Sequence, residues 1–398
     1  MRWSKRGQRT RLVTPLFIRV QLSTFAYFLA VGALQPTLPR YVEGPLHRTS
    51  FYVGLAVGIF ALSAVMLRPL AGRLSDSHGR RLMMVAGAAV VAVSILFYTV
   101  ATTLVSLLVL RLITGVGEAF FYTGAASVIN DLAPDERRGE ALSYFSLALF
   151  LGLALGPLVG ESALGHGHYA GAWIAAAAAA ALASLLGLGL PDTRPDDPAV
   201  TGESTSRIIH PAALVPGAVL GASVWGLATF TAFVPLYALK LGLGGSRFVF
   251  LTYSVFVMSV RSIGARIPDR FGASRTAPTA LTVAAFGLSV MALWQNPLGL
   301  FTGTAIFAIG HSLAFPALMA MAIGSAPPSE RGAVVGTFTA FFDLSFGVGA
   351  LSAGFVADHL GYEGAFLGAA LVAIGGLFLL TAQARKTRAR EAVLAAAD

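Results

Sequence analysis

Long apolar runs, separated by proline, glycine and charged residues, recur from one end of the chain to the other. A helix of roughly 20 apolar residues crosses the ~30 Å hydrocarbon core of a bilayer. The pattern therefore predicts an all-α membrane protein with twelve transmembrane helices. The expected spans are residues 15–37, 51–71, 82–101, 103–128, 139–162, 168–190, 211–237, 246–265, 275–294, 297–323, 333–357 and 362–383.

One long polar stretch interrupts this series. Residues 191–208 are polar and rich in proline, which is typical of a linker. They separate six expected spans from six. We therefore expect a first bundle over residues 1–190, a cytoplasmic linker over 191–208, and a second bundle over 209–398 that ends in a short basic tail.

The composition excludes several classes of function. Of the 398 residues, 56% are hydrophobic and 12% are charged, whereas an ordinary soluble domain has about 25% charged residues. Soluble enzymes and nucleic-acid-binding modules are therefore disfavoured. The absence of cysteine removes disulfides, thiol nucleophiles and zinc–thiolate sites. No ATP-binding motif is present, so we expect no cofactor, and any active transport must use an ion gradient.

The distribution of positive charge predicts the orientation in the membrane. With the N-terminus placed in the cytoplasm, 20 lysine and arginine residues fall on that side and four on the other, while the remaining four lie within spans. Cytoplasmic loops carry such an excess of positive charge. We therefore expect a multi-pass protein of the cell membrane with both termini in the cytoplasm.

An internal repeat with a fixed offset of 193 residues underlies the twelve spans. The stretch at 68–79 (RPLAGRLSDSHG) recurs at 261–272 (RSIGARIPDRFG), and Gly156 falls on Gly349. At the same spacing, Glu118 falls on His311. Repetition over a fixed period predicts repeated structural units. The chain is therefore expected to consist of two homologous six-helix bundles.

Three stretches resemble motifs of the major facilitator superfamily. They are GRLSDSHGRR at 72–81, RLITGVGEA at 111–119 and GLALGPLVG at 152–160. The last resembles a motif associated with the twelve-helix, proton-coupled exporters of the drug/proton antiporter type. The resemblance implies the major facilitator fold and transport by alternating access. Ser77 stands where the loop motif usually has arginine, and the first span carries no acidic residue, unlike many drug exporters.

The resemblance also implies roles for the motif residues. The aspartate of the loop motif would contact the eleventh span, and its mate in the repeat would contact the fifth span, only while the cytoplasmic side is closed. This gating function competes with a simpler role in setting the topology. The candidate gating residues are Gly72, Arg73, Asp76, Gly79, Arg80, Arg81, Asp269 and Arg270, and the antiporter-type helix motif comprises Gly152, Gly156, Pro157 and Gly160.

A carboxyl group is expected near the middle of the fourth span. Arg111, Gly115 and Glu118 are spaced so that they share one helical face. An apolar environment raises the pKa of a carboxyl group, and a nearby arginine lowers it. Together the two effects allow proton exchange near neutral pH. We predict that Glu118 couples proton movement to transport. The alternative is a glutamate permanently paired with a neighbouring span.

Asp343 lies about ten residues into the eleventh span, near His311 of the tenth span in the expected arrangement. An Asp343–His311 pair would be a second proton site, because histidine titrates near pH 6.5. The alternative is a buried structural hydrogen bond. Small residues on the face of Asp343, including Gly347 and Gly354, predict close approach of another helix.

Other polar and aromatic residues are weaker candidates. A central cavity could be lined by Gln21, Tyr27, Gln35, Trp225 and Thr229, although such residues more often serve packing. His166, His168 and Glu161 lie in or beside an outer loop, but a metal site there is not expected.

These observations predict a secondary active transporter and not an enzyme. We expect proton-coupled export of small amphipathic molecules, as in multidrug efflux, by a monomer whose partners are the substrate, protons and the lipid bilayer. Two alternatives stay open. One is a sugar or metabolite carrier of the same superfamily, disfavoured by the small number of hydrogen-bonding side chains in the spans. The other is a membrane receptor without transport activity on the same fold.

Overall fold

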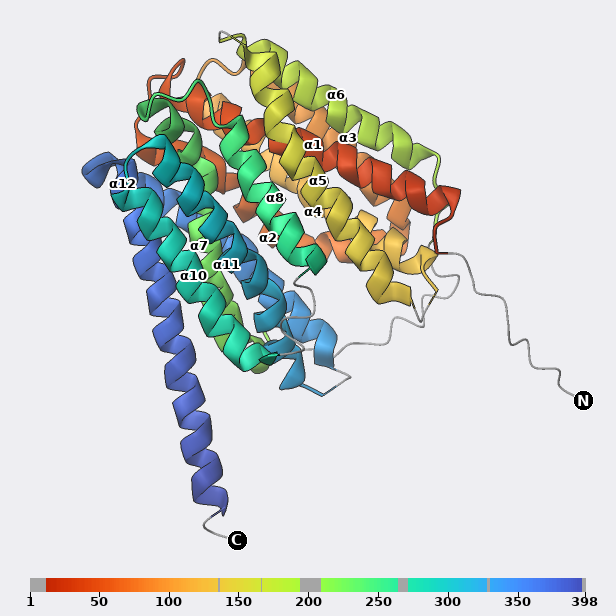
Figure 1. Cartoon of the computed structure of the whole chain (residues 1–398). Helices are drawn as coiled ribbons and strands as arrows, with labels where there is room; N and C mark the ends of the chain where they lie inside the picture. Colours follow the sequence, from red (N-terminus) through yellow and green to blue (C-terminus); the bar gives the residue numbers. More distant parts are fainter. Residues whose placement is uncertain are drawn as a thin grey trace, which may run out of the picture.

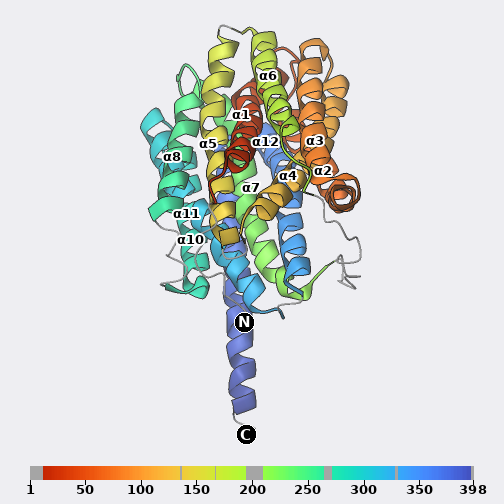
Figure 2. The ribbon, with the colours of Figure 1, turned by 90° about the vertical axis from the view of Figure 1, so that its right-hand side faces the viewer.

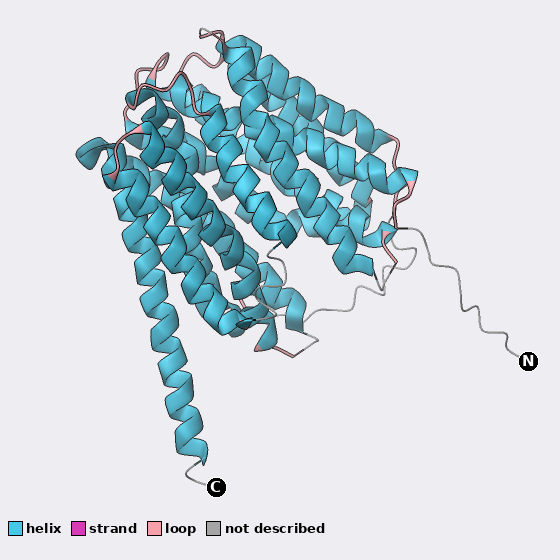
Figure 3. Cartoon of the chain, in the orientation of Figure 1, coloured by secondary structure: helices cyan, strands magenta, loops and turns pink. Residues whose placement is uncertain are grey.

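The structure, a computed structural model, describes residues 12–134, 137–165, 167–193, 209–263, 271–327 and 330–395. Helices joined by short loops make up this part of the chain, and no strand occurs in it (Figure 3). The helices of the first half are α1 (Pro15–Glu43), α2 (Ser50–His78), α3 (Arg80–Leu96), α4 (Leu104–Leu132), α5 (Arg138–Leu164) and α6 (Tyr169–Leu188). Those of the second half are α7 (Pro211–Lys240), α8 (Arg247–Ile263), α10 (Ala273–Leu293), α11 (Pro297–Gly324) and α12 (Arg331–Ala395) (Figure 1).

The helix starts follow from local sequence. Thr14 precedes Pro15 and accepts a hydrogen bond from the backbone N–H of Phe17 at 3.2 Å. Asn296 precedes Pro297 and accepts one from Gly299 at 2.8 Å. A short polar residue before a proline satisfies a free N–H of the first turn, and the proline fixes the backbone angle. These helices therefore begin where the apolar runs begin.

The long helix α12 bends at Gly361, where φ is 72° and ψ is 177°. This conformation favours glycine, and it divides α12 into segments 331–360 and 362–395. Ten helices of the described chain, α12 among them, are long and apolar enough to cross a membrane. With the two parts of α12 and the 17-residue α8, the described residues hold twelve long helical segments, which match the twelve predicted runs.

The ends of some elements differ from the prediction. The third run ends in a short 3-10 helix, η1 (Phe97–Val100), and the last segment continues to Ala395 instead of ending near 383. Polar and charged residues after Thr381 keep helical backbone, so the end of the apolar run does not end the helix. The predicted domain limits at residues 190 and 209 stay a prediction, since 194–208 lie outside the described residues.

Successive helices run in alternating directions. We call the face at which α1, α3, α5, α7, α10 and α12 begin the terminal face, and the other the opposite face. Close packing within the first half uses the antiporter-type motif as its glycine spacing predicts. A Cβ on Gly156 would lie 2.5 Å from the Cα of Gly32, and one on Gly160 would lie 2.2 Å from the carbonyl oxygen of Ala33. Gly152 packs on α1 in the same way, and Pro157 lies inside α5.

The most extensive contacts between the halves are those of α2 with α12 and of α5 with α8 (Figures 1 and 2), and α7 also contacts α1 and α2. Small residues allow α2 and α12 to touch, as predicted for the face that carries Asp343. A Cβ on Gly54 would lie 2.1 Å from the carbonyl oxygen of Ala350, and one on Gly58 would lie 2.6 Å from that of Gly347. Nearer the opposite face the two helices are equally close, because a Cβ on Gly354 would lie 2.6 Å from the carbonyl oxygen of Ser50.

Candidate functional site

An ion pair between the halves lies in the interior of the α2–α12 interface. Arg68 of α2 donates a hydrogen bond from Nη2 to Oδ1 of Asp343 at 3.1 Å, and its Nη1 lies 2.7 Å from Oδ2. The side chains are 24% and 9% exposed, respectively. Two parallel contacts between guanidinium and carboxylate give a strong and directional pair. Asp343 therefore binds the first half and not its own half.

Glu118 lies beside this pair without joining it. The side chain is partly buried, and it forms no hydrogen bond or ion pair with any described residue. The charges of Asp343, Arg68 and Arg111 act on it. One turn further along α4, the ring of Tyr122 lies 5.3 Å from the guanidinium carbon of Arg68. One arginine is thus close to two carboxyl groups and is bonded to only one of them.

The charge of Arg111 acts on Glu118, as the shared helical face predicts, but its hydrogen bonds are made to another helix. Arg111 does not pair with Glu118; its Nε donates to the carbonyl oxygen of Ala56 at 2.8 Å, and its Nη2 donates to that of Val57 at 3.0 Å. The guanidinium carbon also lies 4.6 Å from the ring centre of Phe60. Arg111 therefore fastens α4 to α2. The spacing on α4 could not show this, because the acceptors are backbone groups of another helix.

His311 is not paired with Asp343, so the predicted second site does not form as such in this structure. Its Nδ1 lies 3.1 Å from the hydroxyl oxygen of Ser223 on α7, and its ring lies 5.6 Å from that of Phe307. The predicted partner of Asp343, His311, belongs to the same half. The actual partner, Arg68, comes from the other half.

A second arginine occupies the equivalent position in the repeat. Arg261 of α8 is 193 residues after Arg68, and the residue equivalent to Asp343 is Phe150 of α5. The guanidinium carbon of Arg261 lies 4.1 Å from the centre of the Phe150 ring. Neither arginine was selected as a site residue from the sequence, although the repeat that contains them was the available signal.

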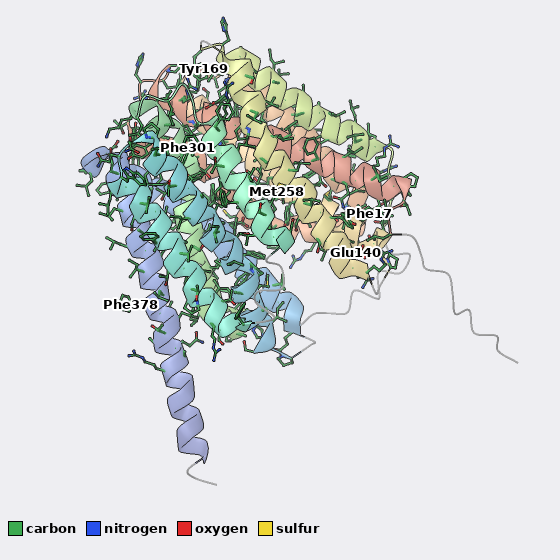
Figure 4. All side chains as sticks on the ribbon, in the orientation of Figure 1. Phe17, Glu140, Tyr169, Met258, Phe301 and Phe378 are labelled. Atoms are coloured by element: carbon green, nitrogen blue, oxygen red, sulfur yellow. The ribbon has the colours of Figure 1, made fainter. Side chains whose placement is uncertain are left out.

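A cavity of about 500 Å³ opens beside Arg261. It lies between the halves, because α5 lines one side while α8 and α11 line the other. Figure 4 labels Glu140 on α5 and Met258 on α8, both of which line it. The α5 residues concerned belong to its first half, so the cavity lies toward the terminal face.

Two carboxylates bind helix starts across the halves at the opposite face, where Glu43 of α1 also accepts a hydrogen bond from the Tyr362 hydroxyl at 2.5 Å. Glu161 of α5 accepts hydrogen bonds from the backbone N–H and hydroxyl of Ser246 at 2.7 and 2.8 Å, and from the N–H of Arg247 at 3.0 Å. Asp358 of α12 accepts from the Thr49 hydroxyl at 2.7 Å and from the N–H of Phe51 at 3.2 Å. Glu161 and Asp358 each meet the start of a helix of the other half, where negative charge is stabilising.

These two residues were not predicted to have this role. Glu161 had been considered only with His166 and His168 as an unsupported metal site. No group of possible metal ligands occurs among the described residues, and His166 lies outside them. The helix starts that the two carboxylates bind belong to the other half, far away in the sequence, so composition gives no signal for these contacts.

The described part of the loop motif makes its contacts within the first half. Arg80 forms an ion pair with Asp131, and Arg81 donates to the carbonyl oxygen of Leu190 at 3.2 Å. Arg73 is exposed, and Gly72 has open space around its Cα. Gly79 has a φ of 108° and precedes α3. Asp269, Arg270 and the side chain of Asp76 lie outside the described residues, so the gating contacts stay a prediction.

The candidate cavity residues are not gathered in one place. Thr229 is fully buried and donates to the carbonyl oxygen of Trp225 in its own helix at 2.9 Å. Trp225 packs against Gly349 of α12. Both therefore serve helix packing. None of the five candidates lines the cavity beside Arg261.

The three candidates on α1 differ in burial. Tyr27 is fully buried, and its ring centre lies 3.7 Å from that of the stacked Phe121 ring, while its hydroxyl has no hydrogen-bond partner among the described residues. Both side-chain polar atoms of Gln21 are also buried without a partner. Gln35 is partly buried. The charge of Glu118 acts on the hydroxyl group of Tyr27, so of these three candidates Tyr27 is the one shown to lie near Glu118.

The fold and site define a multi-pass membrane protein built for transport between two helical halves. The family model of the Major Facilitator Superfamily matches residues 20–285 and 248–396, and the chain belongs to this superfamily of transporters. An uncharacterised MFS-type transporter of Pseudomonas aeruginosa is 30% identical over 387 residues, covering 94% of this chain and 95% of the relative. Among solved structures, a bacterial homologue of the human lysosomal transporter Spinster, in an inward-facing and occupied conformation, is similar with a TM-score of 0.78 at 14% identity. It covers 93% of this chain and 96% of that one. The nucleoside transporter NupG is similar with a TM-score of 0.73 at 15% identity, covering 93% and 99%, respectively.

Membership confirms the predicted fold class and a transport function for small molecules, which is not an enzymatic activity. The structural neighbours act on different substrates, and their low identity carries information on the fold alone.

Proposed function

We propose that the chain is a proton-coupled secondary transporter that exports small amphipathic molecules by alternating access. The observation that supports this is the pairing of Arg68. Asp343, from the other half, holds this arginine, while Glu118, from the same half, lies nearby and has no hydrogen-bond or ion-pair partner among the described residues. One guanidinium between two carboxyl groups on different halves is a two-state element that protons can shift.

The position of a proton decides which carboxylate binds Arg68. When Glu118 carries it, Arg68 stays on Asp343 and holds α2 against α12. When Asp343 carries it, Arg68 is free to pair with Glu118 inside the first half, and the two halves lose their interior ion pair. The contact between the halves therefore depends on which of the two carboxyl groups carries the proton.

The cavity beside Arg261 is the proposed place where the substrate enters. It faces the terminal face, while Glu161 and Asp358 close the opposite face. With both termini in the cytoplasm, as the positive charge predicts, this state receives substrate from the cytoplasm. A mostly apolar lining with a few hydroxyl groups suits an amphipathic molecule.

The test is flux of a fluorescent amphipathic compound in proteoliposomes under an imposed pH gradient. Glu118→Gln removes the alternative partner of Arg68, so proton-driven flux should stop while the protein stays folded and still binds the compound. The matched control is Glu363→Gln, which breaks an ion pair with Lys240 at the opposite face and should leave flux unchanged. Undiminished proton-driven flux in Glu118→Gln would remove Glu118 from the mechanism.

A further inference from the structure

No residue that the structure describes neutralises the charge of Arg261. Arg261 forms no hydrogen bond or ion pair with any described residue, and its buried Nε has no partner. Its side chain nevertheless lines the cavity between α5, α8 and α11. A cation at this depth in a membrane protein is costly and usually pairs with an anion or lines a water-filled path.

Among the described residues around Arg261 there is no free carboxylate. The titratable groups that act electrostatically on Arg261 are the phenols of Tyr253 and Tyr122. The charge of Arg261 in turn acts on the imidazole of His311. Glu140 lies at the edge of the same cavity, but Nε and Nη2 of Arg137 each bind one of its oxygens at 2.8 Å. The cavity therefore keeps an excess of positive charge.

The repeat shows what the site lacks. At the first site, Asp343 supplies the anion for Arg68, whereas Phe150 stands at the equivalent position next to Arg261. An aromatic face stabilises a guanidinium weakly, and it leaves the hydrogen-bonding edge of the group free. That edge fits a carboxylate, a sulfonate or a phosphate through two parallel hydrogen bonds.

We infer that the cavity beside Arg261 binds an amphipathic organic anion, whose charged group takes at Arg261 the place that Asp343 takes at Arg68. This inference rests on the proposed transport function and names its substrate class. The volume of about 500 Å³ suits a small organic molecule. Phe150, Leu147 and Leu313 provide apolar surface for its body, and Ser146 and Ser262 provide hydroxyl groups.

Tyr122 connects this site with the proton-binding site. Its ring lies against Arg68, and Arg261 acts on its hydroxyl group. An anion bound at Arg261 changes the field at Tyr122 and hence around the Arg68–Asp343 pair. Substrate and proton can thus act on the same contact between the halves.

The experiment compares two probes of the same shape on the purified full-length protein in a neutral detergent. Naphthalene-2-carboxylate carries the anion, and naphthalene-2-carboxamide does not. By titration calorimetry, the carboxylate should bind at least about tenfold more tightly, the size expected for one charge-assisted pair. Arg261→Gln should abolish this preference and Arg261→Lys should keep part of it, whereas Arg275→Gln, which removes an exposed charge of the same half, should keep all of it.

A second variant supports the same test without removing the arginine. Phe150→Asp places a carboxylate at the position equivalent to Asp343, so it should fill the anion site and abolish the preference in a folded protein. Equal affinity for the two probes, no binding of either, or a preference that survives both Arg261→Gln and Phe150→Asp would overturn the inference. Proton-driven flux lost in Glu118→Gln would still support the transport mechanism in that case, so the two failures are distinguishable.

Discussion

The two most extensive interfaces between the halves are counterparts in the repeat, yet they use charge differently. At α2–α12, an arginine and an aspartate pair in the interior, and Asp358 closes the opposite face with two hydrogen bonds. At α5–α8, the arginine lies on a phenylalanine beside a cavity, and Glu161 closes the face with three hydrogen bonds. One interface carries its own counter-ion, and the other holds a cation that no described residue neutralises.

This difference suggests a division of labour after duplication of the half. A transporter needs a contact between the halves that an ion can break, and it needs a site that a substrate can fill. The α2–α12 interface suits the first task, because both of its charged partners belong to the protein. The α5–α8 interface suits the second, because its cavity exposes one charge without a partner.

The largest expected effect follows from removing each arginine in turn. Arg68→Gln leaves Asp343 in the interior without a counter-ion, which costs about 3–5 kcal/mol for a fully buried pair. The cost is reduced here because the Arg68 side chain is 24% exposed. Arg261→Gln leaves no carboxylate behind, so its stability should equal or exceed that of the wild type. Thermal unfolding of the purified variants measures the difference.

A double variant provides the control for this comparison. Arg68→Gln combined with Asp343→Asn removes both charges and should recover much of the lost stability, but not proton-driven flux. Similar losses in Tm for Arg68→Gln and Arg261→Gln would contradict the asymmetry between the interfaces.

A moderate effect is expected at the opposite face. The α5–α8 interface lacks an interior ion pair, so it depends more on its closing carboxylate. Glu161→Gln should open this face more than Asp358→Asn, by about 1–2 kcal/mol in the opening equilibrium for lost charge-assisted bonds. Spin labels at cysteines introduced for Arg48 and Gln295, exposed positions of the two halves at this face, report the opening as a longer distance. Equal opening by the two variants would show that the interfaces are equivalent there.

The smallest effect concerns the rings next to the arginines. Phe150→Leu removes the aromatic face from an arginine that has no counter-ion and should lower stability by about 0.5–1 kcal/mol. Tyr122→Leu should have less effect on stability, because Arg68 keeps Asp343 and its ring contact is longer, 5.3 Å against 4.1 Å. Chemical or thermal unfolding of the two variants checks the order, and the reverse order would count against it.

Much of the fold could be predicted from the sequence for a physical reason. The length of the apolar runs and the 193-residue repeat are both properties of the linear sequence, and both correspond to the twelve helical segments of the structure. The bend at Gly361 falls in the expected gap between the last two runs. The end of the last helix could not be predicted in the same way, because helical backbone continues past the apolar run into charged sequence.

The site could be predicted only in part. Glu118 and Asp343 are conspicuous as charges in apolar runs, but their partners depend on packing between distant segments. Arg68 and Asp343 are 275 residues apart, and the acceptors of Arg111 are carbonyl groups that any residue could supply. Comparing the two repeats position by position would have singled out Arg261, since Phe150 replaces the expected carboxylate.

The central claim is that proton binding at Asp343 releases the contact between the halves. It is tested most directly by spin-label distances at the opposite face, measured as a function of pH, and the natural absence of cysteine leaves no background labelling. We predict that acidification lengthens the distance between labels at positions 48 and 295 in the wild type, and that Asp343→Asn has the longer distance at every pH. A wild-type distance that does not change with pH would contradict the account.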